Sequence, residues 1–161
     1  MPDFPSPGIL FKDLTPVLAD AAALALLVDE LTARLRTHEV DKVAGIEARG
    51  FVLAAPVALR LGAGFVPIRK PGKLPAATVR EDYALEYGTD ALEVHRDAVA
   101  PGERVAIVDD VIATGGTAAA AARLVERIGG EVTGLAFAVE LGFLDGAEQL
   151  AGRRHFSLVT Y

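Results

Sequence analysis

The sequence contains no cysteine and no tryptophan, and aromatic residues make up only 6% of its 161 residues. Without cysteine, neither a disulfide framework nor a thiolate metal site can form. No apolar run is long enough to cross a bilayer, since the most apolar stretch, residues 21–28, lies between Asp20 and Asp29. The opening residues, MPDFPSPG, lack the basic and apolar regions of a secretory signal. These absences predict a cytoplasmic location.

Positive charge is also scarce, because 16 Lys and Arg residues stand against 22 Asp and Glu residues, a net charge of −6. A nucleic-acid partner is therefore not expected, since binding to a phosphate backbone needs a basic surface. Four cations nonetheless lie close together in the sequence, at Arg69, Lys70, Lys73 and Arg80. On charge alone, a solvated loop explains them better than a site for a small polyanion.

Hydrophobic residues make up 52% of the chain and charged residues 24%, the balance of a globular protein. The length fits one compact domain, so we expect a single domain over residues 1–161. Apolar periodicity predicts helices over residues 20–35, 51–61 and 117–128, and strands over residues 43–46, 65–68, 104–108, 132–139 and 156–160. This alternation is typical of an α/β fold with a parallel or mostly parallel sheet flanked by helices.

Two segments lack this periodicity. Residues 1–16 contain four prolines and are expected to be irregular. Residues 70–90 mix prolines, glycines and charges, and a loop of this length in a compact domain is usually functional or disordered. Ligands of parallel sheets bind at loops that follow the carboxyl ends of strands. The candidate loops therefore follow Ile46, Ile68 and Val108.

The most informative segment is VAIVDDVIATGGT, residues 105–117. Its adjacent glycines let backbone N–H groups converge on an anion at a helix N-terminus, and Thr114 and Thr117 add hydroxyl donors. A few residues earlier, Asp109 and Asp110 can accept hydrogen bonds from vicinal sugar hydroxyls and favour positive charge on the sugar ring. The whole pattern indicates a phosphorylated ribose.

Other phosphate-binding motifs fit this segment less well. A Walker loop needs a lysine before its final Ser or Thr, where Gly116 stands, and the GxGxxG spacing of a dinucleotide site is absent. Taken separately, a pair of acids can simply bind magnesium, and two glycines can simply begin a helix. The thirteen residues together favour the sugar-phosphate interpretation.

Residues 105–117 resemble the phosphoribosyl pyrophosphate (PRPP) motif of the type I phosphoribosyltransferases. Further stretches are similar to the adenine phosphoribosyltransferases in particular. Residues 3–18 are similar to the N-terminal hood of that family, and residues 45–51, GIEARGF, to its pyrophosphate loop. Residues 69–75 and 81–88 are similar to its catalytic loop. The matches follow the family order and spacing across nearly the whole chain.

The resemblance implies the type I phosphoribosyltransferase fold, with a small hood over about residues 1–18 and a mobile catalytic loop over about residues 70–90. It implies an enzyme of purine salvage that transfers the phosphoribosyl group of PRPP to adenine, giving AMP and pyrophosphate. It further implies a homodimer, and Mg²⁺ that is carried by PRPP without a direct ligand from the protein.

The resemblance also assigns roles to individual residues. The ribose and 5′-phosphate of PRPP are assigned to Asp109, Asp110, Ala113, Thr114, Gly115, Gly116 and Thr117. Pyrophosphate is assigned to Arg49, Arg69, Lys70 and Lys73. Adenine is assigned to Leu10, Phe11 and Lys12. The catalytic residues are Glu86, Asp109 and Asp110, with Glu86 as the acid–base or charge-stabilising group beside the attacking purine nitrogen.

Several of these residues have a simpler interpretation. Residues 3–18 taken alone suit a proline-rich arm that packs on a partner subunit. Arg49 fits an ordinary arginine at a helix start as well as a bidentate pyrophosphate clamp, and Glu86 fits a solvated glutamate. Tyr83 and Tyr87 either help to close the loop or only pack.

Other functions stay open as alternatives. A hypoxanthine–guanine or xanthine phosphoribosyltransferase shares the PRPP motif, although the 6-oxopurine enzymes lack the hood sequence. The orotate enzymes carry a loop of the form RKxxKxHG, whereas this chain has RKPGKLP. A non-catalytic PRPP-sensing protein usually adds a DNA-binding domain, which this length and acidic charge do not favour. A plain nucleotide-binding module is not favoured either, because it would not need Arg49, Lys70 and Glu86 together.

Overall fold

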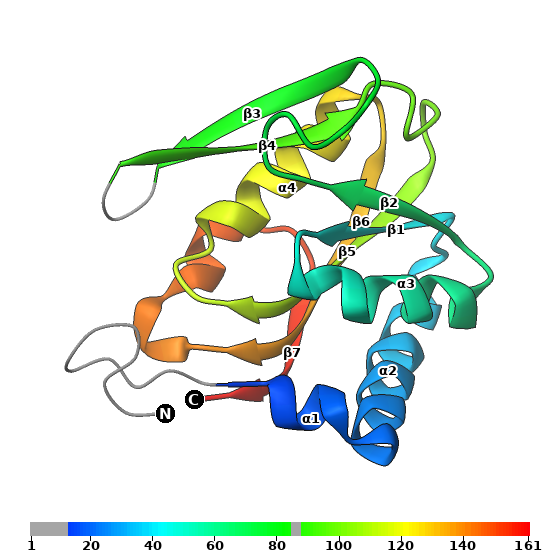
Figure 1. Cartoon of the computed structure of the whole chain (residues 1–161), viewed down its shortest axis with the longest axis vertical. Helices are drawn as coiled ribbons and strands as arrows, with labels where there is room; N and C mark the ends of the chain where they lie inside the picture. The colour runs from blue at the N-terminus through cyan, green and yellow to red at the C-terminus, as the bar shows by residue number, and fades with distance from the viewer. Residues whose placement is uncertain (1–12, 85–87) are drawn as a thin grey trace.

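The computed structural model describes residues 13–84 and 88–161, and a twisted sheet flanked by helices forms its centre (Figure 1). Five strands make this sheet: β1 (Lys42–Ile46), β2 (Gly64–Ile68), β5 (Arg104–Ile112), β6 (Glu131–Glu140) and β7 (His155–Thr160). Their order is β2-β1-β5-β6-β7, and each neighbouring pair is parallel. The predicted α/β class and parallel sheet are confirmed.

Helices α2 (Ala21–Leu35) and α3 (Arg49–Leu61) cover one face of the sheet. The N-terminus of α2 is capped by Asp20, whose carboxylate accepts a hydrogen bond of 2.8 Å from the backbone N–H of Ala23. Apolar residues at helical spacing then turn one side of each helix toward the sheet. This half of the core contains Leu31, Leu35, Leu53, Val57, Val43, Ala106 and Val108.

Helix α4 (Gly116–Arg127) lies on the opposite face, beneath a separate hairpin of β3 (Thr78–Ala84) and β4 (Thr89–His95) (Figure 1). Its buried residues 118–122 are all alanine, and their small side chains allow close approach of the sheet and the hairpin. This half of the core includes Ile68, Leu92, Ile107, Leu124, Leu135 and Phe137.

The irregular structure expected over residues 70–90 is wrong for residues 78–84 and 89–90, which are strands. Strands β3 and β4 pair antiparallel, with Tyr83 opposite Asp90. The face of the hairpin that turns toward α4 carries Glu81 and Asp90 as well as apolar residues. Charged residues on an inward face hide the period-two pattern by which a strand is recognised in a sequence.

Short helices complete the fold: α1 (Thr15–Ala19), η1 (Arg36–His38), η2 (Gly142–Leu144) and η3 (Gly146–Leu150). Helix α1 begins inside the segment expected to be irregular, with Pro16 in its first turn, where proline is tolerated. Five residues with predicted roles lie outside the described residues: Leu10, Phe11, Lys12, Glu86 and Tyr87.

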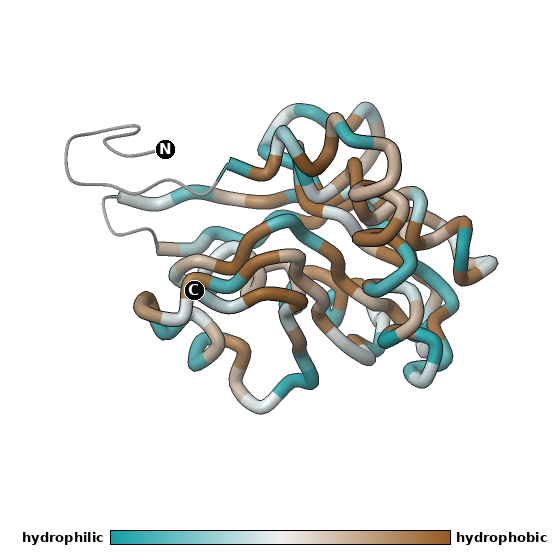
Figure 2. Tube along the Cα trace, turned by 90° about the horizontal axis from the view of Figure 1, so that it is seen from below, coloured by the Kyte–Doolittle hydropathy of each residue, from teal (hydrophilic) through white to brown (hydrophobic). Residues whose placement is uncertain are grey.

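Within residues 13–84 and 88–161, no helix has both the length and the apolar character needed to cross a membrane. Along the described part of the chain, hydrophobic stretches alternate with hydrophilic ones (Figure 2).

Candidate functional site

The candidate site lies where the order of the sheet reverses. The chain leaves β1 toward β2 on one side and leaves β5 toward β6 on the other, although β1 and β5 are neighbours. In a parallel sheet such a reversal opens a crevice at the carboxyl ends of the two strands. A cavity of about 320 Å³ lies there, lined by Ile46, Glu47, Ala48, Arg49, Lys70, residues 109–115, Thr117 and Ala118.

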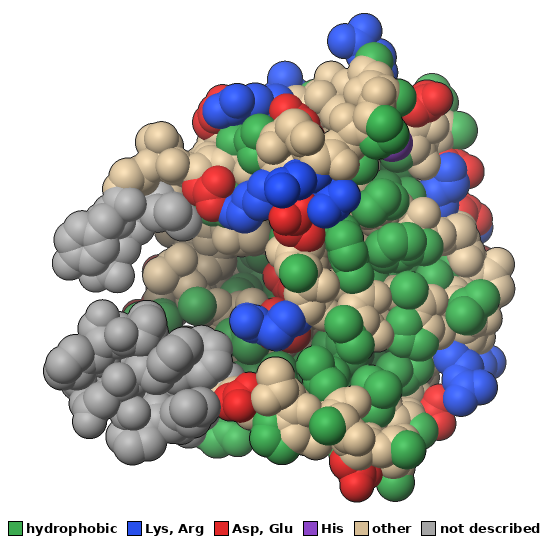
Figure 3. All heavy atoms as spheres, viewed as in Figure 1, with side chains coloured by type: hydrophobic (Ala, Val, Ile, Leu, Met, Phe, Trp, Pro, Cys, Tyr) green, Lys and Arg blue, Asp and Glu red, His purple; other side chains and the backbone are tan. Residues whose placement is uncertain are grey.

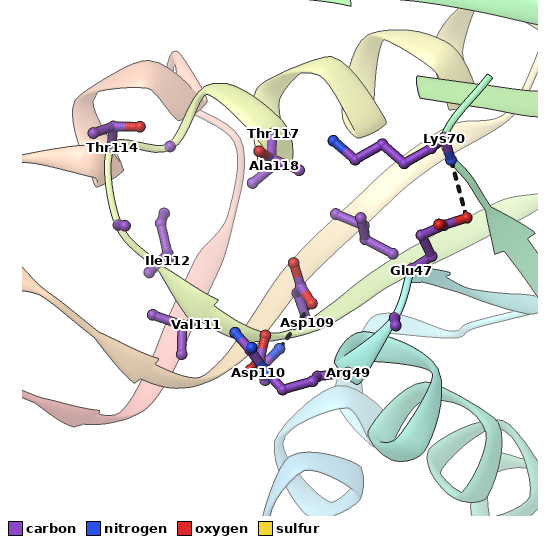
Figure 4. A pocket seen from close by; sticks show the side chains of 14 residues that line it. Glu47, Arg49, Lys70, Asp109, Asp110, Val111, Ile112, Thr114, Thr117 and Ala118 are labelled. Carbon is purple, nitrogen blue, oxygen red and sulfur yellow. Dashed lines mark hydrogen bonds and ion pairs between the residues drawn. The ribbon is translucent and has the colours of Figure 1, made fainter. Parts of the chain in front are cut away.

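The figures show how the lining residues are arranged. The two acids, Asp109 and Asp110, form the floor of the cavity, with Thr114 and Thr117 on one side and Lys70 on the other (Figure 4). In the space-filling view, a hollow lies below the hairpin, and basic side chains stand beside it (Figure 3). One concave site therefore joins the loops after β1, β2 and β5.

The loop between β5 and α4 suits an anion. Gly115 adopts a left-handed backbone with φ of 81°, and α4 begins at the next residue without a side-chain cap. The N–H groups of the first helical turn and the positive end of the helix dipole therefore face the cavity edge. Thr114 is exposed at this edge, whereas the hydroxyl of Thr117 donates to the hydroxyl of Tyr83 at 3.3 Å.

The acid pair lies inside β5, because the strand continues to Ile112 and not only to the predicted end at residue 108. Asp110 is 5% exposed, and its carboxylate accepts a hydrogen bond from Nε of Arg49. The backbone N–H of Asp110 donates to Oδ1 of Asp109 at 2.9 Å. Helix α3 reaches this pair through Gly50, where a Cβ would lie 2.5 Å from Oδ1 of Asp109. A side chain at position 50 would therefore displace the Asp109 carboxylate.

Burial raises the pKa of Asp109 well above its ordinary value of 3.8, and the neighbouring charge of Asp110 raises it further. The charge of Arg49 acts in the opposite direction but is the weaker influence. Asp109 is therefore protonated at a higher pH than an ordinary aspartate.

This shift predicts an acid limb in the pH profile. The sequence predicts that Asp109 accepts hydrogen bonds from sugar hydroxyls as a carboxylate. On that prediction, kcat/KM for PRPP should fall as the pH drops through the raised pKa, at a pH above 3.8. In Asp110→Asn the limb should move to lower pH, because one cause of the shift is removed. A limb that stays in place in this variant would assign the titration to another group.

Unfolding does not produce the same limb. Between the ordinary and the raised pKa, the folded chain binds the Asp109 proton more tightly than the unfolded chain. Asp109 therefore adds stability as the pH falls through this window, which is the opposite sign to the expected loss of activity. Urea unfolding across the same pH range separates the two effects.

Glu47 organises the cations beside the cavity. Its Oε2 accepts hydrogen bonds from Nε of Arg69 at 2.9 Å and from the backbone N–H of Lys70 at 3.1 Å. Arg69 also donates to the carbonyl oxygen of Lys73 at 3.1 Å, and the side chain of Lys73 is exposed. Among the four cations predicted to hold pyrophosphate, Arg49 and Lys70 line the cavity in the described structure, while Arg69 supports the loop behind them.

The sequence did not reveal the roles of Glu47 and Asp90. Glu47 follows directly on β1 in the same loop as Arg49, and this position was a usable signal. Asp90 forms an ion pair with Lys70, but it can be recognised only once the hairpin places it opposite Tyr83. Tyr83, which was open between closing and packing, is buried and hydrogen-bonded to this pair.

Known proteins resemble the chain over its full length. A family model described as "Phosphoribosyl transferase domain" matches residues 17–153. The adenine phosphoribosyltransferase of Thermobifida fusca is 60% identical, over 99% of this chain and 91% of that protein. The crystal structure of adenine phosphoribosyltransferase from Thermoanaerobacter pseudethanolicus has a TM-score of 0.97 at 55% identity, over 100% of this chain and 94% of that chain.

A more distant structure carries ligands. The Saccharomyces cerevisiae adenine phosphoribosyltransferase, complexed with an imino-altritol bisphosphate and adenine, has a TM-score of 0.94 at 41% identity. The alignment covers 98% of this chain and 92% of that chain. This chain and these relatives are therefore similar in sequence and in structure over nearly their whole lengths.

Proposed function

The chain belongs to the adenine phosphoribosyltransferase family, and from this premise we propose that it transfers the phosphoribosyl group of PRPP to adenine, giving AMP and pyrophosphate. One observation of the site carries this proposal. A single cavity at the β1–β5 crevice joins an anion-binding helix start, a pair of carboxylates and the cations Arg49 and Lys70. These are the groups that a phosphate, a ribose and a pyrophosphate require in that order.

In the proposed reaction the 5′-phosphate of PRPP binds the loop at residues 113–117, and the ribose hydroxyls bind Asp109 and Asp110. Arg49 and Lys70 hold the pyrophosphate. A bond forms between a ring nitrogen of adenine and the anomeric carbon, while the bond from that carbon to the pyrophosphate oxygen breaks. The electron pair of the broken bond leaves with pyrophosphate. Positive charge develops on the ribose ring, and the nearby carboxylates stabilise it.

Adenine recognition and proton transfer are assigned to residues outside the described structure. We propose that main-chain groups near Leu10 and Lys12 read the base while Phe11 stacks on it, and that Glu86 accepts the proton from the attacking nitrogen. The resemblance of residues 3–18 and 81–88 supports these roles, and the adenine bound to the yeast relative supports adenine as the base. On the same basis we keep two further predictions. Arg69 and Lys73 contact pyrophosphate, and Tyr87 belongs to the catalytic loop.

Magnesium fits this site as a partner of PRPP. Within the described residues, no three His, Cys, Asp or Glu side chains form a cluster for a metal ion. PRPP would carry the ion through its phosphate oxygens, and Asp109 and Asp110 would hold the ribose hydroxyls beside it without a direct bond to the metal. Bound in this way, magnesium would neutralise charge on the leaving pyrophosphate.

We also propose a homodimer and a cytoplasmic location for a chain that acts as one domain over residues 1–161. Apolar side chains on the outer surfaces of α2 and α3 support the dimer, since Leu26 is 63% exposed and Leu59 is 82% exposed. Hydrophobic side chains gather on the face over α3 in the space-filling view (Figure 3). The cytoplasmic location stays a prediction from the sequence.

The proposal predicts strong preference for adenine. Nucleotide formation should be measured with PRPP and magnesium beside hypoxanthine, guanine, xanthine and orotate. Buried polar groups left without partners by the wrong base are expected to make adenine preferred by about 10⁴-fold or more in kcat/KM. Turnover of a 6-oxopurine at a comparable rate would keep the PRPP site and overturn the role of residues 3–18. PRPP binding without turnover of any base would indicate a sensor.

A further inference from the structure

A polar cluster lies on the inner face of the hairpin, beside the cavity. Tyr83 and Asp90 are directly opposite in β3 and β4, so both side chains leave the same face of the hairpin. Lys70 reaches them from the loop after β2, and Thr117 reaches them from the first turn of α4. The cluster therefore connects the side of the cavity lined by Lys70 to the start of α4, next to the loop at residues 113–117.

The bonds in this cluster are specific. The Tyr83 hydroxyl accepts from Nζ of Lys70 at 3.1 Å and from Oγ1 of Thr117 at 3.3 Å, and it donates to Oδ2 of Asp90 at 3.2 Å. These bonds use its one hydrogen and both of its lone pairs. Asp90 also accepts from the Lys70 ammonium through Oδ2 and from the backbone N–H of Ala91 through Oδ1, at 2.7 Å for the latter. Asp90 is therefore held in place on both oxygens.

Lys70 can still bind an anion. An ammonium group has three hydrogens, and in the described structure two of them go to Tyr83 and Asp90. Lys70 also lines the cavity, so its third hydrogen is available to a ligand there. An anionic ligand that binds Lys70 must then share this ammonium with the negative charge of Asp90.

We propose that Asp90 is the resident counter-ion of Lys70 and that it weakens the binding of pyrophosphate, which allows this product to leave. The inference rests on the proposed function. Asp90 acts through Lys70 and is a positioning residue: it keeps the ammonium at the cavity wall while offsetting part of its charge. The contact with Lys70 lowers the pKa of Asp90, so the carboxylate is ionised at neutral pH.

A separate contact already attaches the hairpin to α4. Glu81 accepts hydrogen bonds from Nε of Arg123 at 2.6 Å and from Nη1 of Arg127 at 2.7 Å. These bonds lie on the same face of β3 as Tyr83, two residues along the strand. Because this clamp holds the hairpin, a charged side chain at Asp90 is not needed for attachment, and a role toward the ligand explains it better.

Asp90→Asn tests the proposal, because asparagine keeps the size of the side chain and an oxygen that accepts from Lys70 but removes the charge. The inhibition constant of pyrophosphate and the KM for PRPP should both fall, roughly three- to tenfold, with a smaller difference at high salt. Asp90→Ser, a second variant without the charge, should shift both constants in the same direction. Asp90→Glu, which retains the charge, should stay within about twofold of the unaltered chain.

Asp82→Asn is the matched control. Asp82 lies on the outer face of the same hairpin, its side chain is 64% exposed, and it pairs with Arg80 at 2.6 Å. Removing this charge should leave both constants unchanged. Unchanged or raised constants in Asp90→Asn and Asp90→Ser, or an equal fall in Asp82→Asn, overturn the proposal.

Failure of the proposed function gives a different result, since the unaltered chain would then form no AMP from adenine and PRPP. Calorimetry with inorganic pyrophosphate alone still tests Asp90 in that case. Tighter binding by Asp90→Asn than by the unaltered chain supports the counter-ion role, and equal or weaker binding overturns it.

Discussion

Asp110→Asn is expected to lower kcat about 100- to 1000-fold while leaving the fold intact. Asp110 is 5% exposed on the cavity floor, where water screens its charge poorly. In the proposed reaction, a full negative charge there would stabilise the positive charge that develops on the ribose ring, and a neutral amide of the same shape would not. Steady-state kinetics with adenine and saturating PRPP measure the effect.

The fold should tolerate this change. Arg49 loses its charged partner, but its side chain is 51% exposed and water can solvate the guanidinium. We therefore expect a loss of about 1 kcal/mol or less in the free energy of unfolding. Asp29→Asn is the control for removing the charged partner of an exposed arginine, since Asp29 forms an exposed ion pair of 3.3 Å with Arg60 between α2 and α3. If Asp110→Asn kept more than half of the normal turnover, the role given to Asp110 would be wrong.

Gly115→Ala is expected to abolish most activity and to lower the free energy of unfolding by about 2–4 kcal/mol. Two costs combine at this position. The left-handed φ of 81° disfavours any residue with a Cβ, and the Cβ would also collide with the backbone carbonyl of Gly146 in η3. Backbone cannot move aside as a flexible side chain does, so the phosphate loop must shift. Urea unfolding and the KM for PRPP measure the two effects.

Gly102→Ala separates these costs. Gly102 has the same φ of 81°, but no atom lies within 4 Å of a Cβ built there. This control should cost only about 1–2 kcal/mol, the penalty of the left-handed conformation, and should leave KM for PRPP unchanged. Equal losses of stability and activity in both variants would show that the contact with Gly146 does not matter.

The sequence predicted most of the main sheet because that information is local. Apolar runs and helical spacing located α2, α3, α4 and the strands β1, β2, β5, β6 and β7 to within a few residues. Residues 105–117 carried their own signal, since an apolar strand, two acids and a Gly-Gly turn are contiguous. The error at the end of β5 arose because Asp109 and Asp110 interrupt the apolar run, although the strand continues through them.

The hairpin escaped prediction because ion pairs, and not only apolar contacts, occupy its inner face. Glu81 looks like a surface residue until Arg123 and Arg127 of α4 are seen beside it. Asp90 likewise looks solvated until Lys70 is placed. A pattern based on hydropathy cannot detect such an inward face.

What the sequence determined by itself is the succession of strands and helices and the position of one candidate phosphate-binding loop, residues 113–117, because both depend on neighbouring residues. Only the tertiary structure decided which distant side chains meet: Arg49 with Asp110, Glu47 with Arg69, and Lys70 with Asp90. The strand order brings these partners together, and the same local patterns are compatible with many strand orders. Polar pairing across that distance therefore becomes visible only when the chain is folded.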